Sequence, residues 1–132
     1  MINKSILKIA SNTENIGIID NCTHFSRLKN TPCGDQIKIY LVVKNQKISK
    51  FKYNGESCIY CQASASLLSK IAKNKSINNL KKFILESNQL FNKKGVIKNN
   101  WKSFSKIMNK KNLTRKECLL LPLRAVKKAL EN

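Results

Sequence analysis

The residues of this chain best suited to chemistry are thiols and one carboxylate that stand near glycine. Cys33 and Asp35 flank a glycine in the stretch TPCGD, Cys58 follows the stretch NGES, and Cys118 stands much later in the chain. A thiolate binds metal or attacks another sulfur atom. These residue types therefore predict a metal site, thiol chemistry, or both.

The cysteine spacing alone does not choose between these chemistries. Cys58 and Cys61 form a single CxxC motif, and the chain lacks the second CxxC of a zinc-finger pattern. No thioredoxin-like βαβ pattern surrounds the pair, which disfavours a thiol oxidoreductase built on these two cysteines. The chain has five cysteines, an odd number, and no export signal, so disulfides are not expected.

An alternating pattern predicts a β-hairpin after the TPCGD stretch. Ile37, Ile39, Leu41 and Val43 fall on one side of the run 37–43, whereas Lys38 and Tyr40 fall on the other, as in a half-buried strand. A turn at Asn45-Gln46 then leads into a returning strand, with Ile48 and Lys50 expected on one face and Phe51 on the other. The first strand begins and the second strand ends at the same edge of such a hairpin.

The predicted elements place the reactive residues near one another. Cys33 and Asp35 precede the first strand of the hairpin, and Cys58 follows its second strand. The spacing of Thr114 and Glu117 resembles a capping box, which predicts a helix start close to Cys118. Thiolates are stabilised at helix N-termini, so these positions suit metal binding.

The remaining pattern predicts an α+β fold: a small antiparallel sheet of about three strands packed against several helices. We expect a short helix within residues 1–15, a further strand within 18–28, and helices from Gln62 onward. The helical stripes comprise Ala65, Leu68 and Ala72; Ile77, Leu80 and Ile84; Trp101, Phe104 and Met108; and Leu119, Leu123, Val126 and Leu130. At 132 residues, the chain is predicted to form a single domain spanning 1–132.

The charge of the chain raises a second candidate function. Lysine and arginine number 26 against 7 acidic residues, which gives a net charge of +19 and a pI near 10.0. Such a balance is typical of nucleic-acid binders, so a basic nucleic-acid-binding module with a structural zinc is the alternative function. The lysines are spread along the whole chain, however, which favours a solvated surface and makes a nucleic-acid partner the weaker hypothesis.

Neither a membrane span nor an export signal is predicted from the sequence. The chain contains no run of some 18 apolar residues, and residues 1–15 lack the apolar core and cleavage site of a signal peptide. We therefore expect a cytoplasmic protein without a membrane partner.

Three motifs resemble the U-type iron–sulfur cluster assembly scaffolds, the IscU, NifU N-terminal and SufU family. They are Pro32-Cys33-Gly34-Asp35, Gly55-Glu56-Ser57-Cys58 with the following Ala63-Ser64-Ala65-Ser66, and Arg115-Lys116-Glu117-Cys118-Leu119. The resemblance extends from about Asn15 to Leu130. It implies an IscU/SufU-like fold and one metal or cluster site formed by Cys33, Asp35, Cys58 and Cys118.

Two departures make the chain most similar to the SufU branch. Scaffolds of the IscU type have a histidine before the last cysteine, where this chain has Glu117. They also carry a Leu-Pro-Pro-Val-Lys stretch upstream, where this chain has Asn112-Leu113-Thr114-Arg115. The Arg115-x-x-Cys118 pattern is instead similar to SufU-type proteins, which hold zinc and accept persulfide sulfur from a SufS-type cysteine desulfurase.

The resemblance implies a cluster scaffold, a zinc-dependent persulfide acceptor, or both. Either a non-enzymatic scaffold or a zinc-dependent sulfurtransferase of the SufU type is compatible with it. The implied cofactor is zinc or a transient [2Fe–2S] cluster, and the implied partners are a SufS-like desulfurase and downstream cluster carriers or apo-proteins. Cys118 is the expected sulfur acceptor. Cys61 is either a core thiol or an auxiliary residue of the site, and Arg115 either steadies a thiolate or is an ordinary cation in the first turn of the helix.

Overall fold

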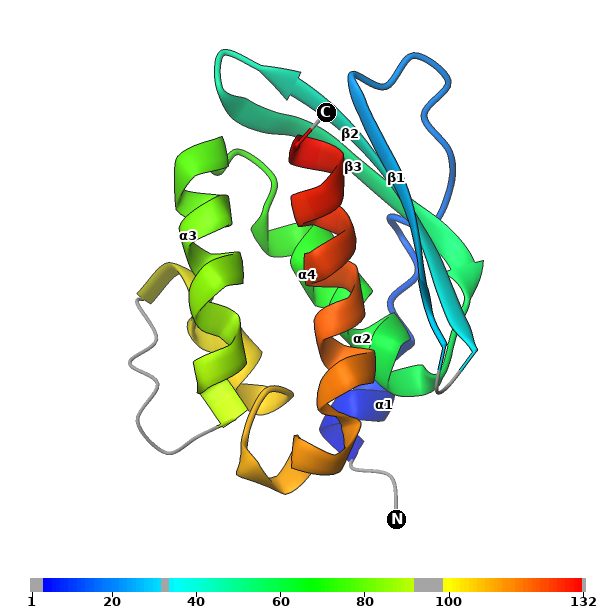
Figure 1. Cartoon of the computed structure of the whole chain (residues 1–132), viewed down its shortest axis with the longest axis vertical. Coiled ribbons are helices and arrows are strands. Elements are labelled where there is room, and N and C mark those ends of the chain that lie inside the picture. Colours follow the sequence, from blue (N-terminus) through cyan, green and yellow to red (C-terminus); the bar gives the residue numbers. More distant parts are fainter. Residues whose placement is uncertain (1–3, 32–33, 92–98, 132) are drawn as a thin grey trace.

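The described residues form one antiparallel sheet with helices layered on one of its faces (Figure 1). The structure is a computed structural model that describes residues 4–31, 34–91 and 99–131. The elements in chain order are α1 (Lys4–Ala10), β1 (His24–Asn30), β2 (Asp35–Lys44), β3 (Lys47–Glu56), α2 (Ile59–Ile71), α3 (Ile77–Ser87), the 3₁₀ helices η1 (Asn88–Phe91), η2 (Asn99–Lys106) and η3 (Lys110–Arg115), and α4 (Lys116–Leu130). This architecture confirms the predicted α+β class.

The predicted hairpin is present as β2 and β3, and β1 completes the sheet in the order β1-β2-β3. Asn45 and Gln46 have φ angles of 52° and 63°, which is the backbone of a type I′ turn. On β2, Ile37, Ile39 and Leu41 are buried at alternating positions, as a strand with one face on the core requires. The start of β2 and the end of β3 therefore meet at one edge.

The predicted face of Ile48 is wrong, because β3 contains a bulge. The register shifts between Val42 and Val43, which pair with Lys50 and Ile48, so Ser49 has no partner on β2. An extra residue in one strand reverses the alternation on either side of it. Ile48 is consequently buried on the core face, whereas Lys50 is exposed.

The first strand begins at His24, inside the expected range 18–28, but it ends two residues beyond that range, at Asn30. The preceding chain pairs instead with the free edge of β3. The Tyr53 N–H donates to the Asn15 carbonyl at 3.1 Å, and the Gly17 N–H donates to the Tyr53 carbonyl at 2.9 Å. The chain must then cross to the far edge of the sheet before β1 can form.

The helices agree with the predicted stripes except in the stretch around Trp101. Trp101 and Phe104 lie in η2, a 3₁₀ helix, and buried Ile107 follows at the same spacing of three. Residues three apart are superimposed along a 3₁₀ helix. A second difference concerns the capping box at Thr114, which does not form: η3 runs directly into α4, and no side chain caps that helix.

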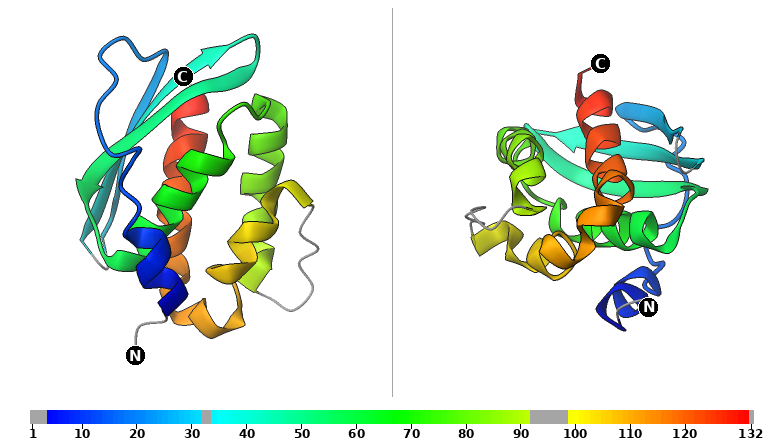
Figure 2. Two further views of the ribbon diagram at one scale, coloured as in Figure 1. Left: turned by 180° about the vertical axis from the view of Figure 1, so that it is seen from behind. Right: turned by 60° about the horizontal axis from the view of Figure 1, so that its bottom comes forward.

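The core lies between the sheet and the helices. α4 packs on β1 and β2, and α2 contacts both α4 and β3. Views from behind and from below show α4 and α2 side by side, with α3 on the side of α4 away from α2 (Figure 2). In the described residues, no helix is long and apolar enough to cross a membrane.

Candidate metal centre

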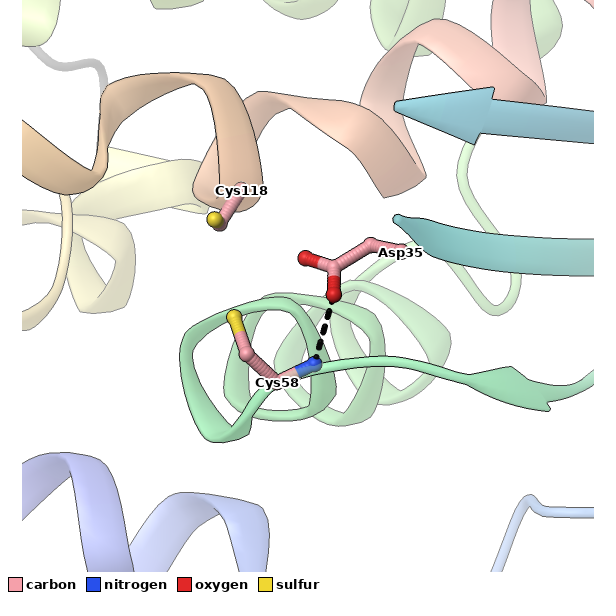
Figure 3. A group of neighbouring side chains, drawn as sticks. All are labelled: Asp35, Cys58 and Cys118. Carbon is pink, nitrogen blue, oxygen red and sulfur yellow. Dashed lines mark hydrogen bonds between the residues drawn. The ribbon is translucent and has the colours of Figure 1, made fainter. Parts of the chain in front are cut away.

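Three elements place one side chain each at the sheet edge where the hairpin ends. Asp35 is the first residue of β2, Cys58 is the N-cap residue of α2, and Cys118 is in the first turn of α4. Because β2 and β3 are antiparallel, the start of β2 lies beside the chain that leaves β3 toward α2. The packing of α4 against α2 then brings the third side chain to the same place (Figure 3).

The potential ligand atoms of these three residues converge. The two sulfur atoms and a carboxylate oxygen all lie within 4.8 Å of one another. Asp35 is 5% exposed and Cys118 is 2% exposed, while Cys58 is half-buried. The group is thus shielded on the α4 side and reachable from solvent beside Cys58.

The Asp35 carboxylate is held through one oxygen and lacks a partner on the other. Its Oδ1 accepts a hydrogen bond from the Cys58 backbone N–H at 2.9 Å. Its Oδ2 is buried without a hydrogen-bond partner, and it points toward the thiols (Figure 3). An unsatisfied buried oxygen is costly, and a cation between this oxygen and two thiolates would remove that cost.

The donor set suits zinc or iron. Zinc is bound by cysteine sulfur and carboxylate oxygen, usually with four ligands in tetrahedral geometry. Cys58 and Cys118 both stand at helix starts, so their two sulfur atoms come from different helices. The fourth predicted ligand, Cys33, lies outside the described residues, two positions before Asp35.

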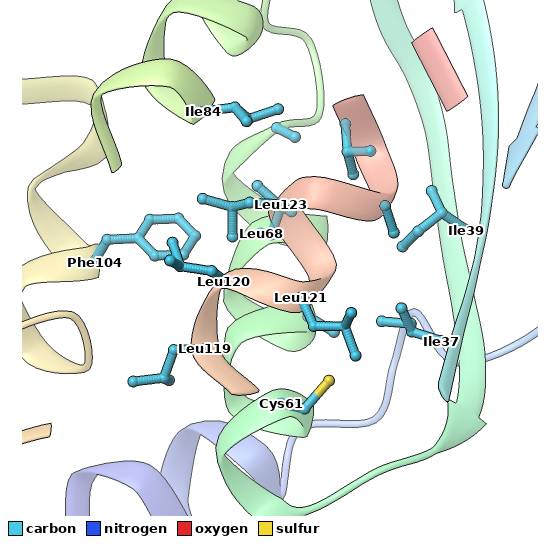
Figure 4. Close-up of a cluster of buried hydrophobic side chains, with 14 of the residues drawn as sticks. Ile37, Ile39, Cys61, Leu68, Ile84, Phe104, Leu119, Leu120, Leu121 and Leu123 are labelled. Carbon is cyan, nitrogen blue, oxygen red and sulfur yellow. The ribbon is translucent and has the colours of Figure 1, made fainter. Parts of the chain in front are cut away.

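Cys61 stands apart from this group. Its side chain is fully buried and points into the core, near Ile37 and Leu121 (Figure 4). Burial raises the pKa of the Cys61 thiol to about 12; a hydrogen bond with the Ser57 side chain opposes this rise, and the nearby charges of Asp35 and Cys58 add to it. Its environment is therefore that of a core thiol.

Arg115 lies at the rim of the site. The side chain is exposed, and its guanidinium carbon lies 5.1 Å from the centre of the Tyr60 ring. Tyr60 follows Cys58 by two positions, in the first turn of α2. The cation–π contact thus joins the starts of α2 and α4 next to the two thiols.

Asn30 is one residue near the site that the sequence analysis did not identify. It is the last residue of β1 and pairs directly with Asp35 across the sheet. Its amide nitrogen is buried without a hydrogen-bond partner. Only the register of β1 on β2 could have identified it, because no motif includes this position.

Comparisons with known proteins agree over nearly the whole chain. A family model described as the NifU-like N-terminal domain matches residues 1–130. The iron–sulfur cluster assembly scaffold protein IscU of Thermotoga maritima is 27% identical over 132 residues, which cover 99% of this chain and 93% of that protein. An uncharacterized protein of Borreliella burgdorferi is 31% identical over 134 residues, covering 99% of this chain and 83% of that protein.

Solved structures show the same fold. FiSufU, a SUF-system cluster assembly scaffold protein from Fervidobacterium islandicum AW-1, aligns with a TM-score of 0.90 and 23% identity over 98% of this chain and 96% of that one. A NifU-like N-terminal protein from Brucella abortus aligns with a TM-score of 0.83 and 21% identity, covering 98% and 91%. None of these similarities supports the nucleic-acid-binding alternative. The chain belongs to the NifU-like N-terminal domain family.

Proposed function

We propose that this chain is an iron–sulfur cluster assembly scaffold formed by a single domain over residues 1–132. Family membership and the similarity to IscU support this function. The structural observation that carries it is the convergence of Asp35, Cys58 and Cys118, with ligand atoms within 4.8 Å and one carboxylate oxygen left without a partner. Cys33 is the fourth ligand in this proposal.

The ligands differ in how firmly they hold a metal. Thiolates bind zinc and iron strongly, whereas the harder carboxylate oxygen is the ligand most easily displaced. The Cys58 N–H holds Asp35 Oδ1 in place, so the carboxylate stays beside the site even when Oδ2 leaves the metal. A bound zinc ion would organise the thiolates, and a [2Fe–2S] cluster would be the cargo that the carboxylate allows to depart.

We assign sulfur acceptance to Cys118. In this step the Cys118 thiolate attacks the outer sulfur of a persulfide on the donor; a new S–S bond forms on Cys118, and the donor cysteine leaves as thiolate. The donor is a cysteine desulfurase, of the SufS type if the similarity to the SufU branch holds. Since Cys118 is only 2% exposed, a bound donor must open the rim between α2 and α4.

The recipients of sulfur or clusters from this scaffold are cluster carriers and apo-proteins. The weak carboxylate ligand supports a carrier role in either branch, because a site with one weak ligand both receives and releases its cargo. The protein remains a scaffold if clusters form on it, and it acts as a zinc-dependent sulfurtransferase if only sulfur passes through Cys118.

Metal analysis of anaerobically purified protein tests the proposal. Zinc, iron and acid-labile sulfide are measured per chain in wild type, Asp35→Ala and Cys22→Ser, together with the visible spectrum. Cys22 lies outside the three-residue group, so its variant should match wild type. Near-stoichiometric zinc without visible bands supports the sulfur-transfer branch, and iron with sulfide and charge-transfer bands supports cluster assembly. Absence of any metal from wild type refutes the site.

Persulfide transfer tests the role of Cys118 separately. The protein is incubated with a cysteine desulfurase and cysteine, and the mass of each cysteine-containing peptide is measured. A gain of one sulfur on the Cys118 peptide is expected in wild type and in Cys22→Ser. Uptake by Cys118→Ser at the wild-type rate would show that another cysteine accepts the sulfur.

A further inference from the structure

Two buried side-chain polar atoms lack a hydrogen-bond partner in the described part of the chain, and both belong to residues of the candidate metal centre or its direct neighbour on β1. They are the amide nitrogen Nδ2 of Asn30 and the carboxylate oxygen Oδ2 of Asp35. One is a donor and the other an acceptor. Buried polar groups are nearly always paired, so an unpaired donor beside an unpaired acceptor requires a functional explanation.

The two residues are direct neighbours across the sheet. Asn30 ends β1, Asp35 begins β2, and the register pairs them. Both side chains lie on the helix-facing side of the sheet. Ser26 is on the same face of β1 as Asn30, Ile39 is on the same face of β2 as Asp35, and both Ser26 and Ile39 are buried. Directly paired residues have Cβ atoms about 4.5–5.5 Å apart, so a rotation of either side chain brings the amide and the carboxylate within hydrogen-bond reach.

The Asp35 carboxylate therefore has two destinations for its second oxygen. Oδ1 is fixed on the Cys58 backbone N–H at 2.9 Å. In the structure Oδ2 is turned toward the thiols (Figure 3). Rotation of the carboxylate about its held oxygen moves Oδ2 away from the sulfur atoms, and the Asn30 amide is the neighbouring donor without a partner.

We propose that Asn30 is a positioning residue for Asp35: its side-chain amide receives Oδ2 when the carboxylate leaves the metal. This inference rests on the proposed metal site. A displaced carboxylate without Asn30 would be buried with an unpaired oxygen, which disfavours displacement. Asn30 makes the weak ligand weaker and so promotes release of metal or cluster.

A double-mutant cycle with Asp35 separates this role from a general structural one. Asn30→Leu keeps a branched side chain but removes the donor, and the smaller Asn30→Ala is a second variant in case leucine packs badly. Each is combined with Asp35→Ala. The variants are loaded with Zn²⁺, and transfer to a colorimetric chelator is followed in time, with thermal unfolding as a check on the fold.

Loss of the Asn30 amide should slow zinc release roughly tenfold, because a hydrogen bond to a charged group is being removed from the released state. In the Asp35→Ala background the same substitution should leave the release rate unchanged. The Co²⁺-loaded forms of wild type and Asn30→Leu should have the same thiolate-to-cobalt absorption, since the bound ligand set does not change.

Several results would overturn the proposal. Equal release rates in wild type and Asn30→Leu, or an equal change in both backgrounds, would remove the link to Asp35. A shifted thiolate-to-cobalt band would mean that the amide donates to a ligand sulfur. Failure of wild type to bind Zn²⁺ or Co²⁺ would overturn the proposed function as well, whereas binding with an additive cycle would overturn the Asn30 inference alone.

Discussion

Replacement of Gly55 by alanine tests whether close backbone approach at the end of the hairpin maintains the metal centre. Gly55 pairs with Ile37 on β2, three residues before Cys58. A Cβ atom at this position would lie 2.1 Å from the Gln36 carbonyl oxygen and 2.9 Å from the Ile37 Cα. The φ angle of +150° is also unfavourable for a residue with a side chain.

The expected cost follows from these two effects. Backbone strain at positive φ contributes roughly 1–2 kcal/mol, and forcing β2 and β3 apart to relieve the overlap contributes about 1–3 kcal/mol more. We expect Gly55→Ala to lower the free energy of unfolding by roughly 3 kcal/mol. Because Gln36 follows Asp35 directly, the displaced strands should also separate the ligands and weaken zinc binding at least about tenfold.

Gly34→Ala is the matched control. Gly34 has a φ of +71°, but a Cβ there would meet no atom within 4 Å. Strain alone then applies, and the expected cost is about 1–2 kcal/mol. Urea unfolding of the metal-free proteins gives both values, and titration with Zn²⁺ gives the affinities. If Gly55→Ala costs no more than Gly34→Ala, the close approach of the two strands is not what stabilises this edge.

Three further predictions follow from the packing and from the site. Ser64→Ala should cost about 1–2 kcal/mol in urea unfolding, because the buried Ser64 hydroxyl donates to the Leu119 carbonyl at 2.6 Å and the substitution leaves that carbonyl without this bond. Cys61, with its raised pKa, should stabilise the fold below its ordinary pKa of 9.0 and cease to do so as the pH rises toward about 12; unfolding free energies over this range should fall less steeply in Cys61→Ala. Zinc at 100 times the wild-type Kd should raise the free energy of unfolding of the wild type by about 2.7 kcal/mol, and a chelator should reverse the gain. An equal gain in Asp35→Ala at the same zinc concentration would mean that the carboxylate is not a ligand.

The sequence was sufficient to predict the parts of the fold that depend on burial of one face. Alternation over 37–43 identifies β2 because Ile37, Ile39 and Leu41 are buried on the core face, although Tyr40 and Val42 on the other face are buried as well. It failed on β3, where the unpaired Ser49 reverses the phase and no residue type marks a bulge. The sequence correctly predicted that Trp101, Phe104 and Met108 are buried but not that the first two lie in a 3₁₀ helix, since apolar residues three apart fit both an α-helical face and a 3₁₀ helix.

The candidate site was predictable as far as its motifs reach. The sequence predicted that Asp35, Cys58 and Cys118 stand at the ends of strands or helices. The antiparallel hairpin further predicted that the first two lie at one edge of the sheet. The position of Cys118 depends on how α4 packs against α2, which periodicity does not specify. Asn30 depends on the register between β1 and β2, and the predicted strand range of 18–28 did not even include it.

The three proposed ligands are made at different times during synthesis of the chain. Asp35 and Cys58 belong to the sheet and to the start of α2, whereas Cys118 belongs to α4, which the ribosome makes some 60 residues later. A nascent chain that ends before α4 has the hairpin edge but only part of the donor set. The proposed site is therefore complete only after α4 docks, and a partly made protein is expected not to sequester zinc or iron from the cell.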